Sequence, residues 1–130
     1  MPNLILEYTD NLDFDPIPFF EKLHHVLAAE VESIRYKGLK SRALKLTEYH
    51  MAEGHPDYKM VCITAVIREG RPKEVKEQIA QILMRMLREE FGPRRAAGEH
   101  ISLATDMREL INGIAITDNT WPVEGLSSKN

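Results

Sequence analysis

The residue with the clearest chemical potential is Pro2, which follows the opening methionine. Its small side chain favours removal of Met1, and that removal would leave a proline with a free secondary amine. Such an amine can accept and return a proton, and apolar surroundings would lower its pKa towards neutrality because burial disfavours the charged form. With Met1 attached, the nitrogen is an amide and cannot act as a base. Many proteins begin Met-Pro without consequence, so Pro2 alone does not identify a catalyst.

Three cationic side chains, Lys40, Arg42 and Arg71, lie where the chain is expected to enter or leave regular structure. Such side chains can bind anions, and arginine can bind a carboxylate with two parallel hydrogen bonds. The alternative is ordinary surface charge near the ends of strands and helices. From these residues alone, surface charge is the favoured interpretation.

The remaining reactive residue types point to packing rather than chemistry. His24 and His25 are neighbours on an expected helix and face different directions, and no cysteine or carboxylate spacing supports a metal site. Cys62 lies in an expected buried strand and is interpreted as inert packing. Arg94 and Arg95 follow Gly-Pro and are expected in a solvated turn. The other histidines, which are likewise interpreted as structural or exposed, are His50, His55 and His100.

Composition narrows the class of protein. The chain has 130 residues, 43% of them hydrophobic and 28% charged, which is ordinary for one globular domain. A net charge of −3 argues against a dedicated nucleic-acid binder. The longest apolar run, at 60–67, is too short to span a membrane. With one cysteine and no signal-peptide pattern, we expect a cytoplasmic protein.

The first half of the chain reads as strand, helix, strand. An aliphatic run at 3–8 suits a buried strand. Asp15 and Pro16 then form a helix start, because aspartate accepts a hydrogen bond at the N-cap and proline suits the first helical position. Apolar residues at spacings of three and four extend this helix to about Ser33. The segment 39–49 follows, where Leu44 and Leu46 alternate with polar residues, as in a half-buried strand.

The second half passes through the same elements, with a strand at 58–67, a helix from Pro72 to about 91–93 and a strand at 99–106. Repeats of a β-α-β unit predict an α+β fold, a four-stranded mixed sheet with two helices on one face. We expect one domain over 1–130, with repeat one at about 2–50, repeat two at about 58–108 and a tail at about 109–130. An apolar open sheet face suggests an oligomer, and part of the tail is expected to pack on a neighbour while its last residues fray.

The order of short motifs along residues 2–110 resembles the tautomerase superfamily, and most closely its double-length members, the 5-carboxymethyl-2-hydroxymuconate isomerases. Each fragment is weak, but their order and spacing together are specific. The stretch Glu69-Gly70-Arg71 also looks like the opening of the short 4-oxalocrotonate tautomerases. The fragments are Pro2 with Glu7, Asp10-Asn11, Gly38-Leu39-Lys40-Ser41-Arg42, Met51-Ala52, Gly54, Asp57-Tyr58 and Gly70-Arg71.

The resemblance implies a trimeric isomerase that uses Pro2 as acid–base and cations as carboxylate ligands. Arg42 and Arg71 match arginines of the family, whereas Lys40 stands where the isomerases have arginine and Asn3 where histidine is common. Lysine keeps the positive charge but lacks the planar guanidinium that binds a carboxylate through two donors. This difference affects the expected identity of the substrate more than the expected class of reaction. Glu7 either orients Pro2 or substrate or simply caps the strand end.

The family chemistry implies an enol–keto or double-bond shift on a 5-carboxymethyl-2-hydroxymuconate-type acid from aromatic ring cleavage. The substrate's conjugation delocalises the charge, so no cofactor is expected, and no nucleic-acid or membrane partner is expected either. Two alternatives remain open: a decarboxylase or hydratase/dehalogenase on the same fold, or a non-catalytic trimer that binds an anionic metabolite or a protein.

Overall fold

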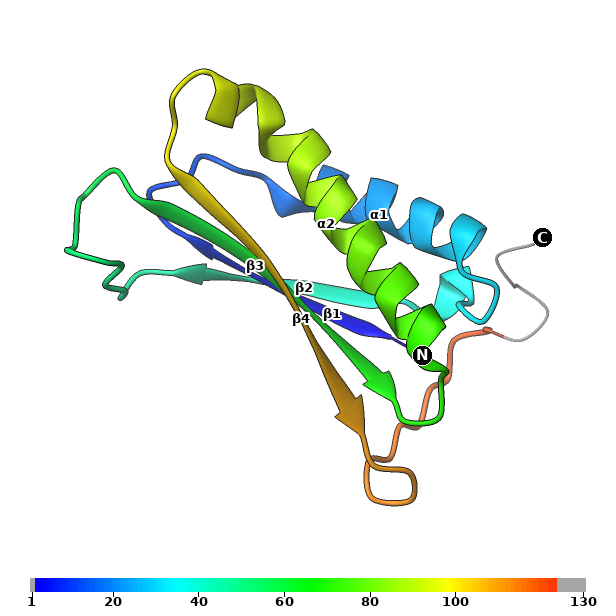
Figure 1. Ribbon diagram of the computed structural model, residues 1–130. Coiled ribbons are helices and arrows are strands. Elements are labelled where there is room, and N and C mark those ends of the chain that lie inside the picture. The colour runs from blue at the N-terminus through cyan, green and yellow to red at the C-terminus, as the bar shows by residue number, and fades with distance from the viewer. Residues whose placement is uncertain (1, 124–130) are drawn as a thin grey trace.

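In the computed structural model, two helices cover one face of a four-stranded sheet (Figure 1). The structure describes residues 2–123. The first half of the chain supplies β1 (Asn3–Thr9), α1 (Pro16–Glu30), the short 3₁₀ helix η1 (Tyr36–Gly38) and β2 (Lys40–Leu46). The second half supplies β3 (Lys59–Arg68), α2 (Lys73–Ala96) and β4 (Ile101–Leu110). The predicted α+β fold of two consecutive β-α-β units is confirmed.

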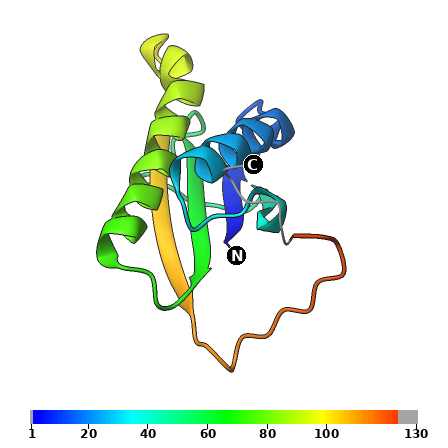
Figure 2. The same ribbon diagram turned by 90° about the vertical axis from the view of Figure 1, so that its right-hand side faces the viewer.

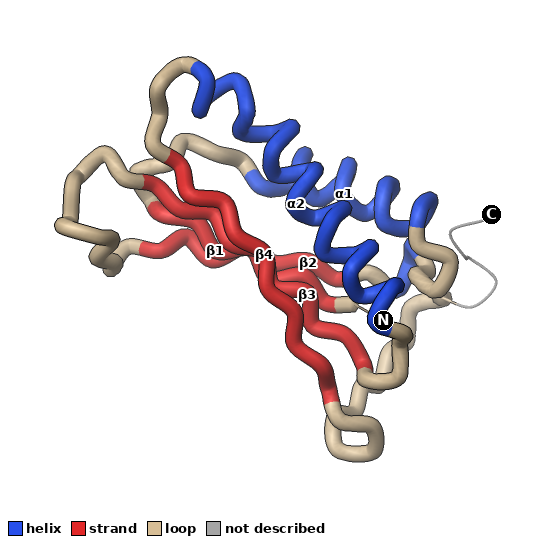
Figure 3. Tube along the Cα trace, viewed as in Figure 1, coloured by secondary structure: helices blue, strands red, loops and turns tan. Residues whose placement is uncertain are grey.

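The sheet has the strand order β2-β1-β3-β4. Each unit forms a parallel pair, β1 with β2 and β3 with β4, and the two units meet through antiparallel pairing of β1 with β3. Figure 3 shows both helices on the same side of the sheet. With this topology, the beginnings of β1 and β2 lie at the same end of the sheet as the ends of β3 and β4.

The core lies between the helices and the sheet. Leu4 and Leu6 of β1, and Ile63 of β3, are fully buried on the helix-facing side, as the alternation of side chains along a strand requires. Phe91 of α2 is also buried and meets the ring of Phe14 edge-on, with the ring centroids 4.9 Å apart. This aromatic contact joins α2 to the loop that precedes α1.

Helix α1 begins as predicted but ends earlier. The side chain of Asp15 accepts a hydrogen bond from the amide of Ile17 at 3.1 Å, and Pro16 occupies the first helical position. The helix ends at Glu30 rather than near Ser33, because the backbone of Val31 is extended. The amide of Val31 closes the last turn by donating to the carbonyl of Leu27. The side chain of Val31 remains buried, so the apolar pattern continues past the helix.

Helix α2 runs to Ala96, beyond the predicted end at 91–93, with Pro93 inside its last turn. The prediction of a solvated turn at Arg94 and Arg95 was therefore wrong. The guanidinium of Arg94 donates to both carboxylate oxygens of Glu99, at 2.8 and 3.0 Å, and to the carbonyl of Asp13 at 2.5 Å. These bonds hold the last turn against residues distant in the sequence.

Strand β2 is shorter than predicted and its leucines face away from the helices. Leu44 pairs with Glu7 of β1 on the open face of the sheet and is 48% exposed. The partly buried residue that contacts the core from this strand is Ala43. The alternation was read correctly, but the leucines lie on the other face from the core.

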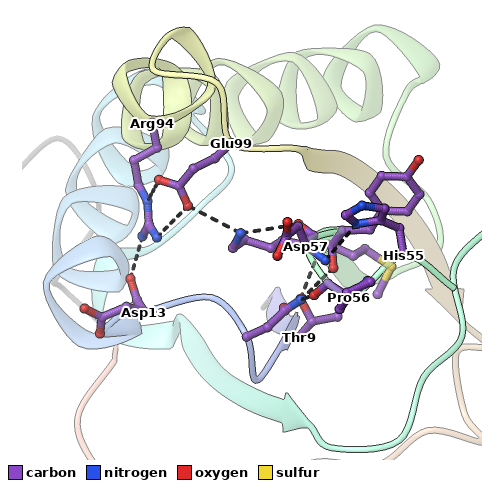
Figure 4. Close-up of polar contacts among 11 residues, drawn as sticks. Thr9, Asp13, His55, Pro56, Asp57, Arg94 and Glu99 are labelled. Carbon is purple, nitrogen blue, oxygen red and sulfur yellow. Dashed lines mark hydrogen bonds and ion pairs between the residues drawn. The ribbon is translucent and has the colours of Figure 1, made fainter.

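The end of the sheet where β3 and β4 begin is held by a polar network (Figure 4). Glu99 accepts the two hydrogen bonds from Arg94, and the ammonium of Lys59 lies 3.7 Å from the same carboxylate. On the neighbouring loop, the amide of Asn11 donates to the carbonyls of Pro56 and Tyr58, at 3.1 and 2.7 Å. The cations of this network are thus paired with a carboxylate.

We expect Glu99→Gln to reduce stability at neutral pH and to flatten its dependence on acid pH. Hydrogen bonds from Arg94 lower the pKa of Glu99 below its ordinary value. The stabilisation is therefore complete above the unfolded value of about 4.3 and disappears as the pH falls through the lowered folded value. Urea midpoints at pH 7 and pH 3, at one protein concentration, measure the change.

Glu48→Gln is the matched control, because Glu48 is an exposed glutamate in the turn after β2. The difference between Glu99→Gln and the unsubstituted protein should shrink at pH 3. A difference of equal size at both pH values would contradict the assigned role of the ionised carboxylate.

Candidate functional site

A cavity of about 400 Å³ lies at the end of the sheet where β1 and β2 begin and β3 and β4 end. Three cations line it: Arg35 from the turn before η1, Lys40 at the start of β2 and Arg68 at the end of β3. No acidic side chain is among its described lining residues. The other lining residues are Asn3, Gly38, Leu110, Thr117, Asn119 and Val123.

Pro2 lies beside this cavity. It is buried, and its carbonyl accepts a hydrogen bond from the backbone amide of Lys40 at 3.4 Å. The next residue, Asn3, lines the cavity. The state of Met1 lies outside the described residues. The first strand therefore delivers position 2 to the same end of the sheet as the cationic side chains.

The three cations predicted from the sequence do not come together in one place. Lys40 lines the cavity, whereas Arg42 is exposed two residues further along β2, opposite Ile5 on the open face. Arg71 follows β3 and donates from Nε to the hydroxyl of Ser33 at 3.3 Å. Burial lowers the pKa of Arg71 from its ordinary value, but arginine remains charged at neutral pH. Only Lys40 of the three lines the described cavity.

Arg35 and Arg68 are the two cations of the cavity that the sequence analysis did not identify. Arg68 donates from Nη1 to the carbonyl of Ala115 at 2.8 Å. In the sequence, Arg68 looks like an ordinary charged residue at the end of a buried strand. Arg35 looks like an ordinary charged residue in a turn. Identifying Arg68 requires knowing that β1 pairs antiparallel with β3, because this pairing brings the end of β3 to the beginning of β2.

The segment 111–123 forms one wall of the cavity, and it leaves the sheet as a long excursion in Figure 2. Its start is fixed by the amide of Asn112, which donates to the Glu69 carboxylate at 2.9 Å. Near its described end, the indole of Trp121 donates to the carbonyl of Lys37 at 2.9 Å, and the ammonium of Lys40 lies 4.9 Å from its ring centroid. This part of the tail contacts its own chain, while the expected fraying concerns residues outside the described range.

Other reactive residue types have structural roles in the described range. His24 on α1 bonds the hydroxyl of Ser41 at 2.6 Å, and burial together with neighbouring His25 lowers the pKa of His24, which favours its neutral form. Burial, with Glu7 and Asp106 nearby, raises the pKa of the Cys62 thiol and keeps it protonated. Among residues 2–123, no group of histidine, cysteine and carboxylate side chains is arranged to hold a metal ion. No described helix is long and apolar enough to cross a membrane.

Comparison with solved structures places this arrangement among the tautomerase-like folds. A 5-carboxymethyl-2-hydroxymuconate isomerase from Deinococcus radiodurans R1 is similar with a TM-score of 0.83 and 31% identity, covering 92% of this chain and 90% of that one. A fused 4-OT wild-type symmetric trimer shares the fold with a TM-score of 0.62 and 12% identity, covering 98% of this chain and 96% of that one. The fold is thus that of an isomerase class built on paired β-α-β units.

Sequence comparison identifies the family. Residues 2–122 match the family described as 5-carboxymethyl-2-hydroxymuconate isomerase. The 5-carboxymethyl-2-hydroxymuconate Delta-isomerase of Escherichia coli is 31% identical over 93 residues, which are 70% of this chain and 73% of that protein. The chain belongs to the 5-carboxymethyl-2-hydroxymuconate isomerase family, and it is an isomerase of the tautomerase superfamily.

We expect Trp121→Ala to loosen the cavity wall without unfolding the core. Trp121 is 49% exposed, and the lost contacts are one hydrogen bond and one cation–π interaction, together about 1–2 kcal/mol. Local opening of 111–123 should therefore increase roughly 5–30-fold. Thermolysin cleavage within this segment, followed by mass spectrometry, measures the opening.

Asp118→Asn is the control, because Asp118 is exposed in the same segment. The urea midpoints of both variants should stay close to that of the unsubstituted protein. Cleavage of Trp121→Ala at the unsubstituted rate would show that the indole does not hold the wall.

Proposed function

We propose that this isomerase acts on a 5-carboxymethyl-2-hydroxymuconate-type unsaturated acid in aromatic catabolism. The single observation that supports this substrate class is the cationic cavity beside Pro2, which has no acidic lining residue in the described range. Its volume of about 400 Å³ lies within the range of small-molecule sites. The reaction moves a proton from the enol oxygen to a distant carbon through a dienolate.

Pro2 is the proposed acid–base. Once Met1 is removed, the secondary amine accepts the proton from the enol hydroxyl and returns it to carbon. An apolar surround would favour the neutral amine, because a buried charge loses its hydration. The conjugated substrate delocalises the charge of the dienolate, so the proposed route needs no cofactor.

Lys40, Arg42 and Arg71 are the proposed carboxylate ligands. Lys40 lines the cavity and is the best supported of the three by position. Arg42 shares the open sheet face with Lys40, and Arg71 lies near the other side of the same sheet end, beside Ser33. Cations near the keto-acid end of the substrate stabilise the negative charge that builds there during proton transfer.

We also propose a homotrimer in the cytoplasm. The face of the sheet opposite the helices carries Ile5, Leu44 and Val66 among polar residues, and a neighbouring subunit would cover it. The symmetric trimer known for the fused 4-OT protein supports the same assembly through its fold. In such a trimer the exposed Arg42 would face a neighbouring subunit and contribute to a shared pocket.

Pro2→Ala, in protein whose intact mass shows that Met1 is absent, should lose most of its activity. Removing a positioned acid–base group lowers the rate by roughly 100–10,000-fold. The measurement is ketonisation of 2-hydroxymuconate, followed by loss of ultraviolet absorbance against the buffer rate. Protein that retains Met1 should be similarly inactive, because its Pro2 nitrogen is an amide.

Pro18→Ala is the matched control, since Pro18 is an exposed proline near the start of α1. It should keep the full rate. Full activity of processed Pro2→Ala would refute the proline mechanism. Release of carbon dioxide during turnover would instead support the decarboxylase alternative.

A further inference from the structure

Two cations of the cavity, Lys40 and Arg68, have partners of a different kind from the six lysines and arginines of the described range that form ion pairs with carboxylates. Elsewhere in the described range, Arg85 pairs with Glu30 and Arg94 with Glu99, and each such carboxylate cancels the charge of its guanidinium. In the cavity, Arg68 donates to a neutral backbone carbonyl, and the ammonium of Lys40 lies over a neutral aromatic ring. These partners orient the two side chains and leave their positive charges uncompensated.

Arg68 is held in place by the segment that forms the cavity wall. Its Nη1 bond to the carbonyl of Ala115 uses one of the five N–H donors of a guanidinium. The side chain is half-buried, so an anion bound to it would be less screened by water than on an open surface. The remaining donors are available to a ligand in the cavity that Arg68 lines.

Lys40 is restrained by the same segment. Trp121 fixes its indole ring through the hydrogen bond to Lys37, and the ring in turn restrains the ammonium of Lys40. Lys40 begins β2 and Arg68 ends β3, on either side of the strand that starts at Asn3. Strands β2 and β3, together with the segment 111–123, therefore position Lys40 and Arg68 around the same cavity. Such an arrangement suits an anion with more than one oxygen.

We propose that Arg68, together with Lys40, binds a carboxylate group of the substrate and makes the enzyme select dicarboxylates over monocarboxylates. This inference rests on the proposed function and adds a specificity-determining residue to it. Arg68 supplies the planar pair of donors that lysine at position 40 lacks. A substrate without the second carboxylate leaves the two cations unpaired, and it loses their contribution to binding.

The test compares two dienols in Arg68→Gln: 2-hydroxymuconate, which has two carboxylates, and 2-hydroxy-2,4-pentadienoate, which has one. For the dicarboxylate we expect kcat/KM to fall roughly 10–100-fold, the usual effect of losing a charge-assisted hydrogen bond. For the monocarboxylate we expect a change below about twofold. Arg68→Lys should recover part of the selectivity, because it restores the charge without the fork.

Arg88→Gln is the control, because Arg88 is an exposed arginine on α2. It should leave both substrates unaffected. Equal losses of kcat/KM for both dienols in Arg68→Gln would show a structural role and would overturn the proposal. An unchanged ratio with full activity would overturn it as well.

A binding measurement separates this inference from the proposed function. Muconate lacks the 2-hydroxyl group and cannot tautomerise, and its affinity can be followed through the fluorescence of Trp121, the single tryptophan of the chain. We expect weaker muconate binding in Arg68→Gln than in the unsubstituted protein, again by roughly 10–100-fold. Muconate binding that depends on Arg68 without any turnover would support the subsite and refute the proposed activity.

The opposite outcomes are equally clear. Turnover of 2-hydroxymuconate with muconate affinity unchanged in Arg68→Gln would refute the subsite and leave the proposed activity intact. Failure of the unsubstituted protein to bind muconate would also overturn the subsite.

Discussion

The antiparallel pairing of β1 with β3 is the constraint on which the site depends. Because each of these strands also has a parallel partner, one end of the sheet collects the starts of β1 and β2 and the ends of β3 and β4. Asn3, Lys40 and Arg68 are distant in the sequence and meet there for this reason alone. A parallel pairing of β1 with β3 would send Arg68 to the far end of the sheet.

The Glu99 cluster and the cavity lie at opposite ends of the sheet, and their cations have different partners. At the end where β3 and β4 begin, the Glu99 carboxylate lies between the cations of Arg94 and Lys59 and pairs with both. At the cavity end, Lys40 and Arg68 are oriented by an indole ring and a carbonyl. Matched charges stabilise a fold locally and bind little, whereas oriented cations without a counter-ion retain their attraction for an anion. The contrast fits a structural role for the Glu99 cluster and a ligand-binding role for the cavity.

Local signals predicted most of the fold. Asp15 and Pro16 mark a helix start through their own backbone chemistry, and the repeated strand–helix–strand order led to the correct architecture. The end of α2 was missed because Pro93 normally signals a break, whereas here the bonds of Arg94 to Asp13 and Glu99 hold the last turn. Those partners are set by tertiary structure, which a local pattern does not contain. The orientation of Leu44 was missed for a related reason, since alternation reveals two faces but not which one the helices cover.

Residues of the site that belong to short sequence motifs could be identified from the sequence, whereas residues that tertiary structure brings to the cavity could not. Short motifs whose order matches a family singled out Lys40, Arg42 and Arg71, and of these only Lys40 lines the described cavity. Arg68 has no motif around it and lines the cavity only through sheet topology. The tail is the extreme case, because Ala115 contributes a carbonyl that any residue would offer and Trp121 acts through its ring. Because this wall acts through backbone groups and one aromatic side chain, the residue types of the segment do not identify it as part of a site. Its role becomes visible only when the two cations that it restrains are seen to have no carboxylate partner in the described range.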